Sequence, residues 1–259
     1  MHPFSCHYQT PYSKTLLIAC DSNYFMNWGQ HCVRSALDNK VAIHCHVVNP
    51  TDNILRDVSC IDFKNFSFSY NVFDFSKYHM YERKAYLYTL RYFIALDFFQ
   101  QNLCHYICIL DADTIIKNNP LEIQSNFFVS YSANAEHDWK KVGGNFVIFH
   151  IQHKEFVKKL CENIIQKFSQ IPDEHSVKQM NKYHRGNTIG LDQSCLAITL
   201  KELNYSNCIQ VPNTEIPLVS KHQSVNSYVW SLTGGNKKNN PQIANFLQNK
   251  YAGIIGKNF

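Results

Sequence analysis

The chain has 259 residues, of which 45% are hydrophobic and only 17% are charged, so it can bury a large core and is not intrinsically disordered. The net charge of +5 is modest, and no basic run is interleaved with aromatic residues, which argues against a nucleic-acid-binding protein. No apolar stretch is long enough to span a bilayer, and the ten cysteines form no CxxC pair. We therefore expect a cytoplasmic protein whose cysteines are reduced and buried.

The first half of the chain alternates between predicted strands and helices. The clearest helix covers residues 82–99, where apolar residues recur three or four positions apart. This alternation is typical of a parallel sheet with right-handed crossovers, so the predicted fold class is α/β. Strands are predicted at residues 15–20, 41–48, 66–73 and 106–110, and helices at residues 27–38 and 82–99.

The second half of the chain has weaker patterns. Gly143 and Gly144 predict a turn that leads into a strand ending at His150. Residues 213–240, which are rich in Asn, Ser, Gly and Lys, are predicted to be loop. One domain is the simplest interpretation, with residues 212–259 as a C-terminal extension that covers the site. Further strands are predicted at residues 126–132 and 209–211, and further helices at residues 154–168, 192–203 and 241–250.

Two carboxylates, Asp111 and Asp113, directly follow the apolar strand 106–110. In an open α/β sheet, this end of a strand borders the ligand crevice. Two carboxylates placed there can hold a divalent cation between themselves and phosphate oxygens. An Asp-x-Asp pair can instead form a simple turn by bonding to local backbone. The apolar strand before the pair favours a metal-diphosphate site.

Other candidate residues lie on three further segments. Asp21 and Tyr24 follow the first strand, where they would contact a nucleotide base or would only form a turn. Arg91 lies in an apolar stretch, so it either pairs with a carboxylate or phosphate or extends to the helix surface. Asp192 and Gln193 open a helix, where an acidic residue also favours the macrodipole.

Glycines and lysines suggest contacts with a sugar diphosphate. Gly144 either forms a plain turn with Gly143 or lets a sugar approach the backbone. Gly234 and Lys237 lie in a cationic loop that could neutralise a leaving diphosphate. Residues 201–259 hold six lysines and two glutamates, which suits a phosphate-bearing ligand or an anionic membrane surface as well as ordinary solvated lysines.

Taken together, these segments resemble the family-8 glycosyltransferases, the group of glycogenin and the bacterial lipopolysaccharide galactosyl- and glucosyltransferases. Three departures from the family pattern are visible: Ser231 stands in place of a metal-binding His, Lys238-Asn239 in place of Pro-Trp, and the Asn-x-Gly order is rearranged at residues 143–145. The matching segments are the nucleotide loop 19–24, the arginine helix 89–93, the metal motif 109–114, the glycine strand 144–149, the Asp-Gln helix start 191–194 and the terminal motif 231–237.

The resemblance implies a GT-A fold, a three-layer α/β/α domain with a mainly parallel central sheet. The implied activity is metal-dependent transfer of a hexose from a nucleotide diphosphate sugar, a UDP-sugar by expectation, to an acceptor hydroxyl in surface glycan or polysaccharide synthesis. Asp111 and Asp113 would bind Mn²⁺ or Mg²⁺, and Asp192 and Gln193 would act at the donor sugar with retention of configuration. The implied donor-binding residues are Asp21, Tyr24, Arg91, Asp111, Ala112, Asp113, Gly144, Asn145, Gly234 and Lys237.

Two other functions stay open at this point. A haloacid-dehalogenase-like sugar phosphatase also carries Asp-x-Asp after an apolar strand, although its motif lies near the N-terminus. A non-catalytic nucleotide-sugar binder is favoured by the absence of the family's His at Ser231. An enzyme in which Asp192 deprotonates the acceptor would invert configuration rather than retain it. The expected acceptor is a glycan or glycolipid, with peripheral contact between the basic C-terminal segment and the inner face of a membrane.

Overall fold

The computed structural model describes two compact units of the chain. Unit 1 comprises Met1–Val72, Leu110–Gln124 and Asn213–Phe259, and unit 2 comprises Phe73–Ile109 and Ser125–Pro212. The described residues are 12–59, 61, 64–131, 140, 142–180, 190–205, 218–221 and 226–232.

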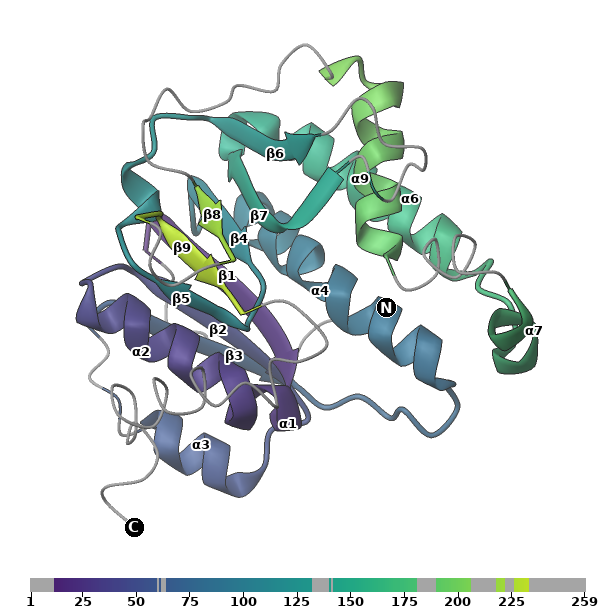
Figure 1. Cartoon of the computed structure of the whole chain (residues 1–259), viewed down its shortest axis with the longest axis horizontal. Helices are drawn as coiled ribbons and strands as arrows, with labels where there is room; N and C mark the ends of the chain where they lie inside the picture. The colour runs from purple at the N-terminus through teal and green to yellow at the C-terminus, as the bar shows by residue number, and fades with distance from the viewer. Residues whose placement is uncertain are drawn as a thin grey trace. The chain divides into compact units, whose positions relative to one another are not determined.

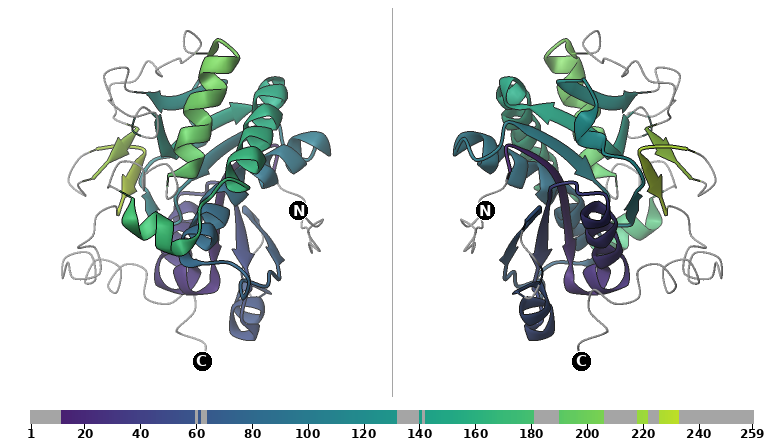
Figure 2. Two further views of the ribbon diagram at one scale, coloured as in Figure 1. Left: turned by 90° about the vertical axis from the view of Figure 1, so that its right-hand side faces the viewer. Right: turned by 90° about the vertical axis from the view of Figure 1, so that its left-hand side faces the viewer.

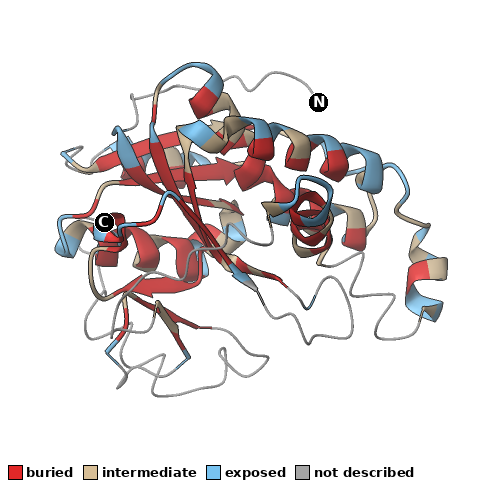
Figure 3. Cartoon of the chain, turned by 90° about the horizontal axis from the view of Figure 1, so that it is seen from above, coloured by how far each residue is buried: buried red, intermediate tan, exposed pale blue. Residues whose placement is uncertain are grey.

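A parallel three-stranded sheet forms the centre of unit 1 (Figure 1). Strands β1 (Lys14–Asp21), β2 (Ile43–Val48) and β3 (Phe66–Asn71) lie in the order β3-β2-β1, and both pairs are parallel. Helix α2 (Gln30–Asp38) connects β1 to β2, and α3 (Asp52–Ser59) connects β2 to β3. The strands are largely buried (Figure 3). The predicted α/β class with a parallel sheet is confirmed.

The chain turns directly from β1 into helix. Asp21 is both the last residue of β1 and the N-cap of α1 (Ser22–Tyr24), because its Oδ1 accepts a hydrogen bond from the Tyr24 amide at 2.7 Å. A π-helical segment, η1 (Phe25–Gly29), then joins α1 to α2. The predicted helix 27–38 is therefore confirmed over α2, and helical structure begins earlier than predicted.

A second, small sheet in unit 1 corrects the loop prediction for residues 213–240. Strand β9 (Val229–Ser231) pairs antiparallel with β5 (Thr114–Ile116) and parallel with β8 (Val219–Ser220). These strands are too short to show alternation in the sequence, and β9 finds its partner more than a hundred residues earlier in the chain. Ile115 of β5, Trp230 of β9 and the adjacent Leu232 pack against Trp28 of η1 in a buried apolar cluster.

Unit 2 combines three strands with packed helices (Figure 2). Strands β4 (Tyr106–Leu110, whose last residue falls in unit 1), β7 (Val142–His150) and β6 (Phe127–Tyr131) lie in the order β4-β7-β6, and β6 pairs antiparallel with β7. Helices α4 (Met80–Gln100), α6 (Lys154–Phe168) and α9 (Leu191–Glu202) pack against one another. The remaining short helices of the described chain are α7 (Glu174–Gln179), η2 (Pro120–Glu122) and η3 (Ile151–His153).

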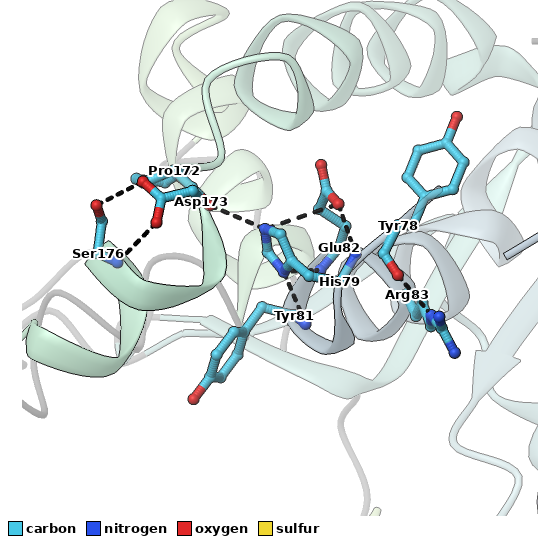
Figure 4. A network of polar contacts seen from close by, with 8 residues as sticks. All are labelled: Tyr78, His79, Tyr81, Glu82, Arg83, Pro172, Asp173 and Ser176. Atoms are coloured by element: carbon cyan, nitrogen blue, oxygen red, sulfur yellow. Dashed lines mark hydrogen bonds and ion pairs between the residues drawn. The ribbon is translucent and has the colours of Figure 1, made fainter. Parts of the chain in front are cut away.

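A histidine caps the start of α4 (Figure 4). His79 Nδ1 accepts hydrogen bonds from the amides of Tyr81 and Glu82 at 3.2 and 3.4 Å, and Glu82 Oε2 accepts from the His79 amide at 2.9 Å. His79 Nε2 donates to the Pro172 carbonyl at 2.9 Å, which ties the start of α4 to the segment before α7. Because histidine is an uncommon N-cap, the sequence prediction placed this helix start at Glu82 rather than at Met80.

The turn predicted at Gly143 and Gly144 is wrong, because both residues lie within β7. Strand 209–211 and helix 241–250 lie outside the described residues, as does most of the predicted extension 212–259, so the single-domain interpretation stays a prediction. Among the helices of the described residues, none has the length and apolar character needed to cross a bilayer.

Candidate functional site

In unit 1, the helical turn α1, which follows β1, contacts the Asp-x-Asp motif. Tyr24 donates its phenolic hydrogen to Asp113 Oδ2 at 2.7 Å, across 89 residues of sequence. Asp113 is buried, with only 4% of the residue exposed, whereas Asp111 is partly exposed. Asp21 lies one helical turn before Tyr24 as the N-cap. We call Tyr24, Asp111 and Asp113 the carboxylate cluster.

The small sheet carries two hydroxyl groups beside this cluster. The amide of Leu232 donates to the Asp113 carbonyl at 2.9 Å, and Thr114 pairs directly with Ser231 across β5 and β9. Among the described residues, Thr114 Oγ1 and Ser231 Oγ are buried atoms with no hydrogen-bond partner. Ser231, the residue at the family's His position, is therefore held next to the motif. Thr114 was not singled out from the sequence, although it directly follows Asp113.

The carboxylate cluster is chemically suited to a hard divalent cation. Mg²⁺ and Mn²⁺ prefer carboxylate oxygens, and Mg²⁺ in nucleotide sites is held by one or two carboxylates together with substrate phosphates and water. Asp111 and Asp113 supply two such carboxylates. Within the described part of the chain there is no group of three or more His, Cys, Asp or Glu side chains arranged to hold a metal. A cation here would thus depend on ligand oxygens to complete its coordination.

A thiol on α2, that of Cys32, lies close enough to the cluster for the carboxylates to change its pKa. Burial raises the pKa of Cys32 well above its usual range, and the carboxylates of Asp113 and Asp111 raise it further. Cys32 is therefore a neutral thiol at physiological pH. It packs beneath the motif as a small apolar side chain and not as a metal ligand, in agreement with the expectation of buried, reduced cysteines.

In unit 2, Arg91 and Asp192 form a buried ion pair. Arg91 Nη2 lies 2.9 Å from Asp192 Oδ2, and the two side chains are 7% and 6% exposed. Arg91 comes from α4 and Asp192 from the first turn of α9. Of the alternatives for Arg91, pairing with a carboxylate is the one observed. Asp192 lies in the first turn of α9, and its side chain also forms this ion pair. The guanidinium donates to Asp192 Oδ2 and so holds the carboxylate in place.

Gly144 is the residue that makes room for this ion pair. A Cβ atom at position 144 would lie 2.7 Å from Asp192 Oδ2 and 3.2 Å from Arg91 Nη2. Gln193, the next residue on α9, donates from Nε2 to the Val142 carbonyl of β7 at 3.0 Å. We call Arg91, Gly144, Asp192 and Gln193 the ion-pair cluster. In this structure the group that closely approaches Gly144 is the Asp192 carboxylate, and the predicted approach of a sugar stays a prediction.

The other predicted site residues are less informative. Ala112 is buried between the two aspartates, and Asn145 lies in β7 with its Oδ1 near Gly143. Gly234 and Lys237 lie outside the described residues.

Comparison with known proteins adds no family. No protein-family model matches the chain, and no curated protein matches it.

Proposed function

We propose that this chain is a metal-dependent glycosyltransferase that moves a hexose from a nucleotide diphosphate sugar, a UDP-sugar by resemblance, to an acceptor hydroxyl. The observation that carries the proposal is the hydrogen bond from Tyr24 to Asp113 Oδ2 at 2.7 Å. It joins the segment after β1, whose sequence resembles a nucleotide-binding loop, to a buried carboxylate of the Asp-x-Asp motif. A nucleotide diphosphate needs such a pairing, with its base on one segment and its phosphates on the other.

The carboxylate cluster would bind the cation that stabilises the leaving diphosphate. Breaking the bond between the sugar and the diphosphate develops negative charge on the phosphate oxygens. Asp111 and Asp113 would hold Mn²⁺ or Mg²⁺, and the cation would supply Lewis-acid stabilisation of that charge. Gly234 and Lys237 are proposed to contact the same phosphates. Asp21 keeps one carboxylate oxygen beyond its N-cap bond with which to accept a base N–H.

The ion-pair cluster is proposed to bind the donor sugar. Arg91 holds the Asp192 carboxylate in one orientation, and the bond from Gln193 to the backbone fixes the neighbouring amide. An oriented carboxylate can accept hydrogen bonds from sugar hydroxyls. Retention of configuration is proposed, with Gln193 near the anomeric carbon. Gly144 and Asn145 border this group on β7.

The proposed acceptor is a hydroxyl of a glycan or glycolipid in surface polysaccharide synthesis. The six lysines among residues 201–259 suit contact with anionic lipid headgroups, so we propose a cytoplasmic protein that binds the inner face of a membrane peripherally. The acceptor and the membrane contact rest on resemblance and charge alone.

Release of UDP from a panel of UDP-hexoses, measured with Mn²⁺, tests the proposal. Asp113→Asn should lower UDP release on the order of 100-fold, because it removes a charge that holds the cation. The matched control is Asp38→Asn, which removes a carboxylate from the surface pair with Arg34 on α2 and should leave the rate unchanged. Equal rates for Asp113→Asn and the wild type would refute the site. Release of inorganic phosphate from sugar phosphates, without UDP-sugar turnover, would instead identify a phosphatase.

A further inference from the structure

A continuous hydrogen-bonded row of side chains links β2 to β3 in unit 1, the two neighbouring strands of Figure 1. His44 Nδ1 lies 2.8 Å from Ser67 Oγ, and His44 Nε2 lies 2.7 Å from Ser69 Oγ. His46 Nδ1 lies 2.7 Å from the same Ser69 Oγ, and His46 Nε2 lies 2.9 Å from Asn71 Oδ1. Each imidazole thus spans two positions of β3, and Ser69 is shared by both rings. We call these five residues the histidine relay.

The acceptor at one end sets the direction of every bond in the relay. Asn71 Oδ1 can only accept, so His46 Nε2 carries a proton, and in the neutral ring His46 Nδ1 then accepts from Ser69. Ser69 Oγ then accepts from His44 Nε2, and His44 Nδ1 accepts from Ser67. Both histidines are therefore neutral Nε2–H tautomers, and all four bonds point towards Asn71. This arrangement satisfies the buried polar groups of β2 without any charge.

The relay is too deeply buried to act on a substrate. His44 and His46 are 0% exposed, and Ser67 and Ser69 are each 1% exposed. On β1, the residues paired with the two histidines are Leu17 and Ala19. The next β1 residue on that face is Asp21, whose Oδ1 already accepts the Tyr24 amide. Serine–histidine catalysis is excluded by this burial, and a conformational role remains.

The relay ends where the strands lead into the loops of unit 1. The Asn49 amide donates to the carbonyl of Asn71 at 2.8 Å. Ser22, which directly follows Asp21, donates its hydroxyl to the Asn49 carbonyl. The backbone N–H and C=O of Asn49 therefore connect Asn71 to the first turn after β1.

The geometry tolerates one added proton but not two. A proton on His46 Nδ1 turns the Ser69 hydroxyl towards His44 Nε2, and His44 then carries its proton on Nδ1 and donates to Ser67. All four contacts survive in this reversed state. A second proton, on His44, makes both rings donate to Ser69 and leaves the serine hydrogen without a ring acceptor. It also places two positive charges side by side in a buried site.

The acid–base behaviour of the histidines agrees with this order. Burial lowers the pKa of His46 to about 4, and its bond to Asn71 partly offsets the effect. Burial lowers the pKa of His44 to about 3, and the charge of His46 lowers it further. His46 is thus the first to accept a proton, as the reversible state requires.

We propose that the histidine relay is an acid-sensitive clamp: one proton reverses the three bonds between Ser67 and His46, and a second proton releases β3 from β2 and loosens Asn49 and Ser22. The proposal does not depend on the enzymatic activity proposed above. It concerns the fold of unit 1, and its test needs no ligand.

Nitrogen NMR of the full-length protein, labelled with ¹⁵N at histidine, tests the clamp directly. At pH 7 both relay histidines should be Nε2–H tautomers, as their ring ¹⁵N shifts report. As the pH falls towards 4, His46 should become cationic while His44 changes to the Nδ1–H tautomer. Nδ1–H tautomers at pH 7, or two histidines that titrate together near 6.5, would overturn the proposal.

Amide hydrogen exchange supplies the second measurement. Exchange in β3, relative to β1 at the same pH, should accelerate once the pH falls below the first protonation step. Ser69→Ala removes the shared hydroxyl and should abolish the tautomer change of His44, whereas Ser76→Ala, in an exposed turn, should not. If Ser69→Ala does not fold, the wild-type titration alone decides. Equal protection of β1 and β3 throughout the acid range would contradict the release of β3.

Discussion

At the scale of single residues, one long-range side-chain bond defines each of the two clusters. Asp111, Asp113 and Arg91 were singled out from their places beside apolar runs, and Asp192 from its place at the start of a helix. The bonds that define the clusters span 89 residues for Tyr24 and Asp113 and 101 residues for Arg91 and Asp192. Such pairings depend on tertiary packing, which local patterns do not encode. The sequence also gave equal weight to Asp21 as a simple turn residue, and its N-cap bond shows that it does have that structural role.

Gly144 should be the least replaceable glycine of β7. Gly144→Ala places a Cβ 2.7 Å from the buried Asp192 Oδ2, so the ion pair must move, and we expect a loss of about 1–3 kcal/mol in the free energy of unfolding. Gly143→Ala is the matched control, because its Cβ meets Asn145 Oδ1 at 3.1 Å and Ser130 Cβ at 3.3 Å. Urea denaturation of both variants measures the difference. A loss for Gly144→Ala no larger than for Gly143→Ala would show that the ion pair does not depend on this glycine.

Tyr24→Phe should weaken both the fold and the cation site. The variant removes the donor to Asp113 Oδ2, and a hydrogen bond to a charged group stabilises by about 1.5–3 kcal/mol. Because partners of metal-binding side chains set their orientation, Mn²⁺ affinity should fall by about 10-fold or more. Electron paramagnetic resonance of free Mn²⁺ measures this affinity. Tyr88→Phe, at an exposed position of α4, is the control. Unchanged affinity in Tyr24→Phe would separate Tyr24 from the cation site.

At the scale of elements, length decided what the sequence could predict. β4 and α6 have the predicted bounds, because their apolar patterns are complete within one element. β5, β8 and β9 have two or three residues each and were not recognised. α3 and α7 were also missed, since each offers only one or two turns of pattern. β2 was predicted although it carries two histidines. In the structure, the histidine relay provides both rings with hydrogen-bond partners without any charge.

The histidine relay predicts how stability depends on pH. The pKa values of His44 and His46 are lowered to about 3 and about 4 in the folded protein, from 6.5 in the unfolded chain. The unfolded chain therefore binds more protons below pH 6.5, so stability is full above 6.5 and is lost as the pH falls towards 4. Each histidine contributes at most about 1.4 kcal/mol per pH unit in this window.

Denaturation of the wild type and of His46→Gln at pH 7, 6 and 5 isolates one of these contributions. The slope of the unfolding free energy against pH should be smaller in His46→Gln, by up to about 1.4 kcal/mol per unit below pH 6. His105→Gln, which replaces a histidine at an exposed position, is the control for the substitution itself. Identical slopes for the wild type and His46→Gln would mean that His46 is not held neutral by the fold.

At the scale of the whole molecule, the α/β class followed from the alternation of strands and helices. The division of the backbone into two units did not, because unit 1 gathers three separate stretches of sequence. Each unit holds one of the two clusters, with the carboxylate cluster in unit 1 and the ion-pair cluster in unit 2.

The most direct test of this account is a thermal-shift measurement with UDP, GDP, CDP and ADP, each with and without Mn²⁺. A ligand at 100 times its Kd stabilises the folded state by about 2.7 kcal/mol, which corresponds to a rise of roughly 5–10 °C in Tm for a chain of this size. We predict this rise for UDP, only in the presence of Mn²⁺, and its loss in Asp113→Asn. No rise with any nucleotide, or a rise with UDP that needs neither Mn²⁺ nor Asp113, would contradict the proposed site.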